Sequence, residues 1–197
     1  MKKTLYTALI LVFAFAGIAK AQHSAFTIEI PVTIPVGNTA DFIDQTAIRG
    51  INIEYQRFIK PEFAIGGEIG HSTLYKREDS KVYTEGTASL SGIQYRYQYA
   101  YPILVTGTYF PMTAGKVKPF AGLGIGTVAQ DRRLDMGIFS SEETHWQFAL
   151  RPELGLFFEP SPQVGFKLGA KYYNSFESNN LEGQSNIGIN FGLVFLR

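Results

Sequence analysis

Apolar and polar residues alternate with a period of two along most of this chain. Near the C-terminus the apolar set is Ile187, Ile189, Phe191, Leu193 and Phe195, and the residues between them are mostly small or polar. Successive side chains of a β-strand point to opposite faces, so this pattern predicts a strand with one apolar face. The pattern returns about eight times over runs of about ten to twelve residues, a length typical of tilted strands that cross a bilayer.

Eight strands are predicted, joined by connections of two alternating kinds. The strands cover about residues 25–36, 47–58, 63–74, 97–110, 119–130, 146–158, 164–172 and 187–195. The second, fourth and sixth connections are short and contain Pro, whereas the others are long and polar, at about residues 37–46, 75–96, 131–145 and 174–184. An up-and-down barrel places all the short turns at one end and all the long loops at the other. The predicted fold is therefore all-β, an eight-stranded antiparallel up-and-down barrel.

Period-two alternation also suits a soluble barrel with its apolar face inside. The residue types on each face distinguish such a barrel from a transmembrane one. The interior of an eight-stranded barrel is just wide enough for side chains to fill, and the polar face is rich in Gly. This polar face also carries the charges of the strands: Glu29, Glu54, Glu68, Arg151, Glu153, Lys167 and Lys171. A cation facing lipid near the midplane costs about 2–4 kcal/mol. We therefore predict a transmembrane barrel whose charged residues point into the lumen.

Aromatic residues gather near the ends of the apolar faces. Two rings of Tyr and Phe around an aliphatic band are typical of the girdle at the two membrane interfaces. The predicted girdle comprises Tyr55, Phe63, Tyr109, Phe158, Phe166 and Phe195 towards the short turns, and Tyr97, Tyr99 and Tyr172 towards the long loops.

The N-terminus has the organisation of a cleaved signal peptide. Lys2 and Lys3 precede the apolar stretch Leu5 to Ile18, and Ala19-Lys20-Ala21 forms a small-x-small cleavage site. We expect residues 1–21 to be removed and residues 22–197 to form one barrel domain. Cleavage removes three of the 18 basic residues and leaves 15 against 17 acidic ones, a balance that gives no support to nucleic-acid binding. The chain has no cysteine, which excludes disulfides and thiolate chemistry.

Two segments carry a resemblance to a known family. They are the glycine-alternating run Pro119 to Gly126 and the closing strand Gly188 to Phe195. With the strands, girdle and loop asymmetry, they make the chain similar to small outer-membrane β-barrels of the OmpA/OmpX/OmpW type. The resemblance implies an outer-membrane location, contact with lipid and lipopolysaccharide, and insertion by the barrel-assembly machinery. Nothing follows the last strand, so we do not expect the peptidoglycan-binding domain often found in the OmpA branch.

The inward charges are the first candidate for a functional site. Glu54, Glu68, Arg151, Glu153, Lys167 and Lys171 either line a polar pore or pair to plug the lumen, and the narrow interior favours the plug.

Catalysis and metal binding find little support. His71 and Ser72 are neighbours on a strand and point to opposite faces, so they cannot form a nucleophile–base pair. Ser140, Ser141, Glu142, Glu143 and His145 lie in a predicted loop without the spacing that fixes a catalytic or metal site. We expect no enzyme activity, metal or cofactor.

The predicted function is a structural or surface-interaction role for a non-enzymatic outer-membrane barrel with a plugged lumen. The surface partner is not identifiable from the sequence. An alternative is passive transport of small or hydrophobic solutes, as the OmpW resemblance implies, through a side opening in the wall. Pro102 and Pro152, which we expect on apolar faces, could mark the weakened pairing that such an opening needs. A lipid-modifying enzyme is the third possibility.

Overall fold

The computed structural model describes residues 23–85, 88–137, 139–178 and 181–197. The predicted signal peptide, residues 1–21, lies outside the described residues. No helix among the described residues is long and apolar enough to cross a membrane.

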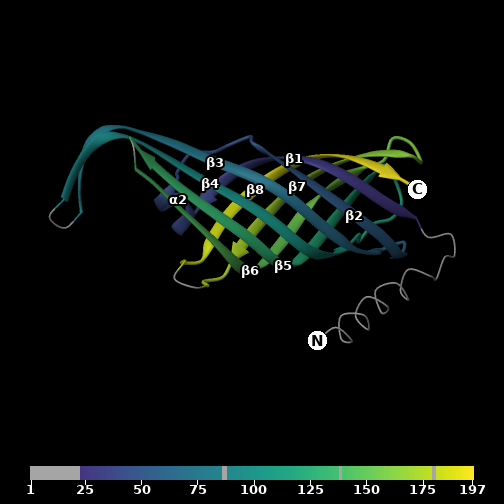
Figure 1. Cartoon of the computed structure of the whole chain (residues 1–197). Coiled ribbons are helices and arrows are strands. Elements are labelled where there is room, and N and C mark those ends of the chain that lie inside the picture. Colours follow the sequence, from purple (N-terminus) through teal and green to yellow (C-terminus); the bar gives the residue numbers. More distant parts are fainter. Residues whose placement is uncertain (1–22, 86–87, 138, 179–180) are drawn as a thin grey trace, which may run out of the picture.

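Eight antiparallel strands form a closed barrel in which each strand pairs with its neighbours in sequence, and the last pairs with the first (Figure 1). Because the ring is closed, its strands have no free edge on which another chain could pair and aggregate. This confirms the predicted fold class. The elements are β1 (Ser24–Val36), α2 (Asn38–Phe42), β2 (Gly50–Lys60), β3 (Phe63–Glu85), β4 (Ala88–Tyr109), β5 (Val117–Met136), β6 (Phe139–Phe158), β7 (Val164–Ser175) and β8 (Gln184–Leu196).

The apolar face of the strands points outwards. Along β7, buried and exposed residues alternate strictly from Gly165 to Tyr173. The exposed positions include Leu154 and Val105, each 67% exposed, whereas Lys171 and Glu54 are fully buried. The barrel is therefore polar inside and apolar outside, the reverse of a soluble protein's distribution.

Four strands are longer than the sequence pattern predicted. Residues 75–96 and 131–145 were expected to be long loops, but the β3–β4 pairing continues to Glu85↔Ala88 and the β5–β6 pairing to Met136↔Phe139. The apolar alternation predicts where one face of a strand must be apolar, and it fades where both faces meet water or polar groups. Tyr75 and Tyr95 continue the strands there because aromatic residues favour β structure.

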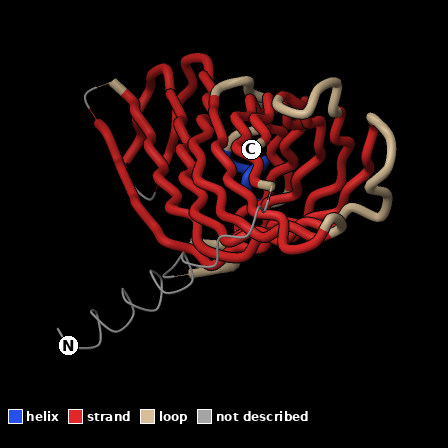
Figure 2. The backbone as a smooth tube through the Cα atoms, turned by 90° about the vertical axis from the view of Figure 1, so that its right-hand side faces the viewer, coloured by secondary structure: helices blue, strands red, loops and turns tan. Residues whose placement is uncertain are grey.

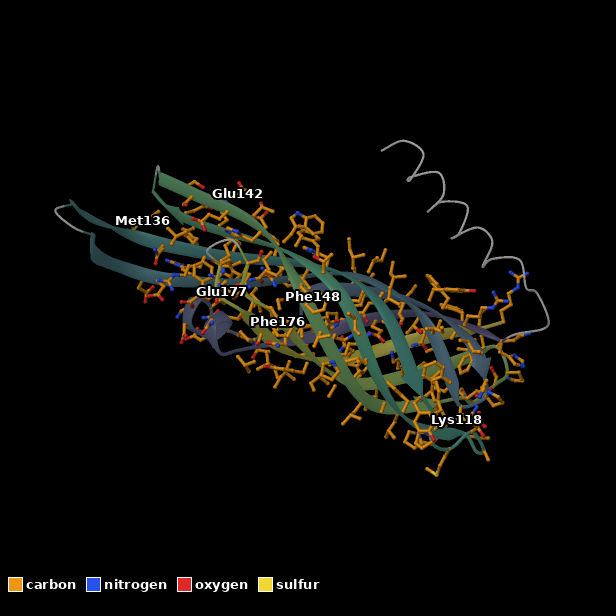
Figure 3. All side chains as sticks on the ribbon, turned by 90° about the horizontal axis from the view of Figure 1, so that it is seen from below. Lys118, Met136, Glu142, Phe148, Phe176 and Glu177 are labelled. Carbon is orange, nitrogen blue, oxygen red and sulfur yellow. The ribbon has the colours of Figure 1, made fainter. Side chains whose placement is uncertain are left out.

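The lengthened strands form a four-stranded sheet that projects from one end of the barrel (Figure 1). We call this sheet the extension, made of residues 73–85, 88–99, 131–136 and 139–144. The first pair between β2 and β3 at this end is Gly50↔Ser72, and the last pair between β6 and β7 is Ala149↔Ser175. Beyond these levels β3 and β6 form the two edges of the extension. Figure 3 shows Met136 and Glu142 on the extension, and Lys118 at the opposite end of the barrel.

The first long connection also contains regular structure. The short helix α2 lies between β1 and β2, and Figure 2 shows it within the outline of the ring. Thr39 and Ile43 are fully buried. The Oγ1 of Thr39 donates a hydrogen bond to Oε1 of Gln184 at 2.9 Å, which ties the helix to β8.

Prolines coincide with interruptions of strand pairing. The β1–β2 pairing ends at Glu29↔Asn52, just before Pro31. The β3–β4 pairing pauses between Ile69↔Ile103 and Ser72↔Ala100, beside Pro102, and resumes in the same register. A proline has no N–H to donate to the ladder, which accounts for the pauses.

The β6–β7 pairing pauses in the same way beside Pro152, between Leu150↔Asn174 and Glu153↔Lys171. Pro152 is exposed on the apolar face, as expected. The placement of Pro102 on the apolar face was wrong: it is buried on the lumen side, because it shares its strand parity with Leu104 and Ala100.

Candidate functional site

Seven buried charged side chains occupy the middle of the lumen, contributed by β1, β2, β3, β6 and β7. The four carboxylates and three cations are each at most 7% exposed. The structure brings together all six residues of the predicted network and adds one from the same face. The set, called the charge layer below, is Glu29, Glu54, Glu68, Arg151, Glu153, Lys167 and Lys171.

Arg151 of β6 pairs with three carboxylates. Its Nη2 lies 3.1 Å from Oε2 of Glu68 and 3.7 Å from Oε1 of Glu54. Its Nη1 donates to Oε2 of Glu153, two residues further along the same strand. One guanidinium thus connects β6 with β2 and β3 across the lumen.

The two lysines of β7 complete the charge layer. The Nζ of Lys167 lies 2.6 Å from Oε2 of Glu54, 3.0 Å from Oε1 of Glu153 and 3.1 Å from Oε1 of Glu29. The Nζ of Lys171 lies 2.6 Å from Oε2 of Glu68 and also pairs with Glu29. Every carboxylate of the layer therefore contacts at least two cations, which offsets the cost of burying it.

Neutral side chains satisfy further carboxylate oxygens. The hydroxyl of Tyr173 donates to Oε1 of Glu68 at 2.7 Å, and Nε2 of Gln56 donates to Oε1 of Glu54 at 3.0 Å. The sequence analysis did not single out either residue, although Tyr173 shares its strand parity with Lys171.

Glycines on facing strands provide the space for these side chains. A Cβ on Gly124 would lie 3.0 Å from Nε of Arg151, and one on Gly192 would lie 3.0 Å from Cγ of Glu29. Both contacts would be tighter than ordinary packing. The glycine-rich polar face therefore admits long charged side chains into a narrow barrel.

A layer of phenylalanines fills the lumen towards the short turns. Phe110 lies at its centre, with ring centroids 5.5 Å from Phe58, 5.8 Å from Phe120 and 6.3 Å from Phe157. The space that remains between this layer and Lys167 is about 10 Å³. The sequence analysis missed these residues because it expected only small or polar groups on the lumen face.

Amide side chains occupy the lumen towards the extension. Nδ2 of Asn52 donates to Oδ1 of Asn190 at 3.2 Å, and Nε2 of Gln98 donates to Oε1 of Gln130 at 3.2 Å. A cavity of about 20 Å³ is lined by Asn52, Gln130, Pro102 and Tyr173, among others. This volume is enough for about one water molecule.

The helix α2 covers the lumen above the amides. Phe42 lies between two guanidiniums, with its ring centroid 4.6 Å from Cζ of Arg132 and 5.5 Å from Cζ of Arg96. Arg96 donates to the carbonyl oxygen of Phe42 at 3.0 Å, and Arg132 donates to Oε1 of Gln184 at 2.5 Å. Burial lowers the pKa of Arg132 from its ordinary value.

The predicted aromatic girdle lies on the outer surface. Tyr55 is 52% exposed and Phe166 is 51% exposed, whereas Tyr99 is half-buried. Phe158 and Phe166 stack at a centroid distance of 6.4 Å across β6 and β7. Four more residues of the set are exposed, namely Phe63, Tyr109, Phe195 and Tyr172, and Tyr97 is half-buried like Tyr99.

His71 and His145 each lie close to a polar side chain on a strand. Nε2 of His71 lies 3.0 Å from Oγ1 of Thr73, and its ring stacks 4.8 Å from that of Tyr101 on the outer face. His145 lies 3.5 Å from Glu143 on β6. Within the described part of the chain, no group of three His, Cys, Asp or Glu residues could hold a metal ion.

Comparisons with known proteins agree with this architecture. A search of curated proteins found no match. A major outer membrane protein from Thermus thermophilus has a similar structure, with a TM-score of 0.57 and 8% identity over 90% of this chain and 100% of that one. Ail, the attachment invasion locus protein of Yersinia pestis, has a TM-score of 0.55 and 13% identity, and the match covers 90% of this chain and 100% of Ail. Neisserial surface protein A has a TM-score of 0.53 and 12% identity, and the match covers 89% of this chain and 97% of that protein.

At identities this low, the structural similarity shows only that the fold is shared. The family is shown by a comparison of the sequence with family models. Residues 6–195 match the family described as outer membrane protein beta-barrel domain. The apolar outer face and polar lumen described above are the arrangement that such a barrel needs in lipid. The chain belongs to the outer membrane protein beta-barrel family.

Proposed function

We propose that this protein is a non-enzymatic barrel of the outer membrane whose lumen is closed by paired charges and whose role is structural or in surface interaction. The observation that carries the proposal is the charge layer. Three cations and four carboxylates from five strands pair with one another, and six of these pairs have N–O distances of 2.6–3.7 Å. An ion path would have to break several buried pairs, each of which is costly to open.

Three further layers support a closed lumen. The phenylalanine layer lies on one side of the charges, and the amide layer and α2 lie on the other. The two small spaces that adjoin the charge layer, of about 20 Å³ and about 10 Å³, each have room for about one water molecule. A solute larger than water would need all four layers to move.

The extension supports the surface-interaction part of the proposal. Its edge strands β3 and β6 continue beyond the closed ring, and its strands carry exposed charged residues such as Arg77 and Glu142. Ail, which shares the fold, is named as an attachment invasion locus protein. We extend a contact role at the cell surface to this chain as part of the proposal.

Export and insertion follow from the same proposal. Residues 1–21 would direct the chain across the inner membrane and be cleaved, and the barrel-assembly machinery would insert the strands. Lipid and lipopolysaccharide would then surround the outer face.

The experiment that tests the closed lumen is conductance and solute uptake in reconstituted vesicles. We expect the ion conductance and the uptake of sugars and amino acids to equal those of protein-free vesicles. A vesicle preparation with a known porin provides the positive control. Steady conductance above the protein-free level would overturn the proposal.

Passive transport of hydrophobic solutes is the second candidate, and the paused pairing beside Pro102 and Pro152 is the observation that favours it. Against it, the space beside Pro102 is small and lined by polar groups such as Asn52 and Gln130. The variant Pro102→Ala with Pro152→Ala restores both N–H donors. Transport through the wall predicts that this variant slows the uptake of a hydrophobic solute, whereas a sealed wall predicts no uptake by either protein.

A further inference from the structure

A row of tyrosines runs up the outer face of the extension. Tyr95, Tyr97, Tyr99 and Tyr101 occupy successive outward positions on β4, and Tyr75 lies beside them on β3. The rings of Tyr97 and Tyr99 are parallel within 1° at a centroid distance of 6.3 Å. Tyr75 lies 5.1 Å from Tyr97 and 6.5 Å from Tyr95. We call these five residues the tyrosine row.

The row begins in the lipid-facing band and leaves it. Tyr101 is its lowest member, and it lies two residues from Ile103, which is 50% exposed on the outer wall. Ala129 of β5 pairs with both Tyr101 and Trp146, so Trp146 lies at the same level as Tyr101. Tyr95 lies six residues from Tyr101, which is about 20 Å along the strand. The row therefore spans the layer next to the hydrocarbon, where the headgroups of the outer leaflet lie.

Charged and polar groups border the tyrosine row. Across β4 and β5, Tyr97 pairs with Arg133, Tyr99 with Asp131 and Tyr95 with Asp135. On the other side, Arg77 pairs with Tyr95. Cations and carboxylates thus lie within one strand spacing of the rings, on both sides for Tyr95.

The hydrogen-bonded pairs at the border hold their charges in place. Nε of Arg133 lies 2.9 Å from Oδ2 of Asp135, and Oγ of Ser140 donates to Oδ1 of Asp135 at 2.6 Å. The hydrogen bonds from Ser140 and Arg133 lower the pKa of Asp135, so this carboxyl is ionised at neutral pH.

The inner face of the extension is already occupied. Lys76 pairs there with Asp44 at 3.2 Å and with Glu78 at 3.1 Å, and Arg96 holds Phe42 of α2. The cations on that face are therefore engaged within the protein. The outer face with the tyrosine row is the one that faces the surrounding leaflet.

Sugar rings fit the chemistry of this face. Tyrosine combines an apolar ring, on which the C–H face of a sugar can stack, with a hydroxyl that stays hydrated. Asp131 and Asp135 can accept hydrogen bonds from sugar hydroxyls, and Arg77 and Arg133 can bind phosphate substituents through paired N–H donors. A plain lipid headgroup offers the phosphate but no ring to stack.

We propose that the tyrosine row binds the saccharide headgroup of a glycolipid in the same outer leaflet, with sugar rings stacked on Tyr95, Tyr97 and Tyr99. This inference rests on the proposed surface-interaction function and names its site and its ligand class. The glycolipid is the chosen partner because the row is continuous with the lipid-facing wall and extends from it to headgroup level. Binding would anchor the extension to the leaflet around it.

The test uses the whole barrel in nanodiscs of deuterated phosphatidylcholine, with the core oligosaccharide released from lipopolysaccharide as the probe. Saturation of the aromatic protons should transfer to the sugar-ring protons in NMR spectra of the wild type. For Tyr95→Ala with Tyr97→Ala we expect binding to weaken roughly tenfold. Tyr97→Phe keeps the ring and should keep the transfer.

Tyr109→Ala is the matched control, because Tyr109 is an exposed outward tyrosine at the opposite end of β4. It should leave the transfer unchanged. Equal transfer in the double variant and the wild type would overturn the proposal, as would the absence of transfer in the wild type.

A second measurement separates the sugar from the lipid part. Thermal unfolding is compared in nanodiscs that contain complete lipopolysaccharide or lipid A alone, since a ligand stabilises the state that binds it. We expect complete lipopolysaccharide to raise the midpoint more, and the double variant to lose that difference. An equal difference in both proteins would place the binding elsewhere. Vesicle conductance of the double variant should match the wild type, so failure here is distinguishable from failure of the closed-lumen proposal.

Discussion

Each buried charge of the lumen depends on its partners, because a charge taken out of water is stable only beside groups of the opposite sign. Arg151 contacts three carboxylates, and Glu29 contacts both lysines of β7. Four carboxylates oppose three cations, so the layer carries one excess negative charge when all groups are ionised. Loss of a cation should therefore be more damaging than loss of a carboxylate.

Arg151→Ala should lower the free energy of unfolding by about 3–5 kcal/mol, because Glu54, Glu68 and Glu153 each lose one of their two cations and four buried carboxylates are left with two lysines. The measurement is the unfolding midpoint in detergent, followed by intrinsic fluorescence and by mobility on gels. Lys60→Ala, at an exposed position, is the control. An unchanged midpoint for Arg151→Ala would show that the pairs contribute nothing to the barrel.

The excess carboxylate gives a second prediction at this scale. Glu29→Gln leaves three carboxylates for three cations, and we expect it to cost about 1 kcal/mol or less. Lys171→Gln removes a cation from the same pair and should cost about 3–5 kcal/mol. Denaturant unfolding of the two variants under identical conditions compares them, and the opposite order would refute the charge count.

At the scale of strands, alternation in the sequence reported the part of each strand that faces lipid. It predicted the ends of β3 and β4 at the short turn well, with Phe63 as the first residue of β3. It did not predict that these strands continue into the extension, because strand pairing there requires no apolar face. Tyr75 and Tyr95 lay in a predicted loop for this reason, although aromatic residues favour β structure.

Close contact between strands supplies the prediction for this scale. A Cβ on Gly66 would lie 1.9 Å from the carbonyl oxygen of Tyr55, whereas one on Gly67 would have its nearest neighbour at 3.5 Å. Gly66→Ala should therefore force β2 and β3 apart and cost about 1–3 kcal/mol. Gly67→Ala should be tolerated. Unfolding midpoints of the two variants provide the comparison, and equal midpoints would contradict the contact.

At the scale of the whole molecule, the arrangement of connections predicts which end faces outwards. The extension and α2 lie at one end, and the short turns lie at the other with both ends of the described barrel, Ser24 and Arg197, hydrogen-bonded together. Outer-membrane barrels have short periplasmic turns and long extracellular segments. The extension should therefore be outside the cell.

The absence of cysteine makes this sidedness easy to test. A membrane-impermeant maleimide added to intact cells should label Glu142→Cys, which lies on the extension, and leave Thr113→Cys, which lies in a short turn, unlabelled. Permeabilised cells should show labelling of both. Labelling of Thr113→Cys alone in intact cells would reverse the orientation.

The sequence by itself determined the number of strands, their order and the direction that each face points. These properties are local, because alternation, glycine content and charge on one strand already state whether a face meets lipid or lumen. Only the tertiary structure decided which charges pair, that phenylalanines and α2 fill the two ends of the lumen, and that β3–β6 continue into a projecting sheet. Those features depend on the register and spacing of residues far apart in the chain, such as Glu29 with Lys171, and no periodic pattern within one strand encodes that distance.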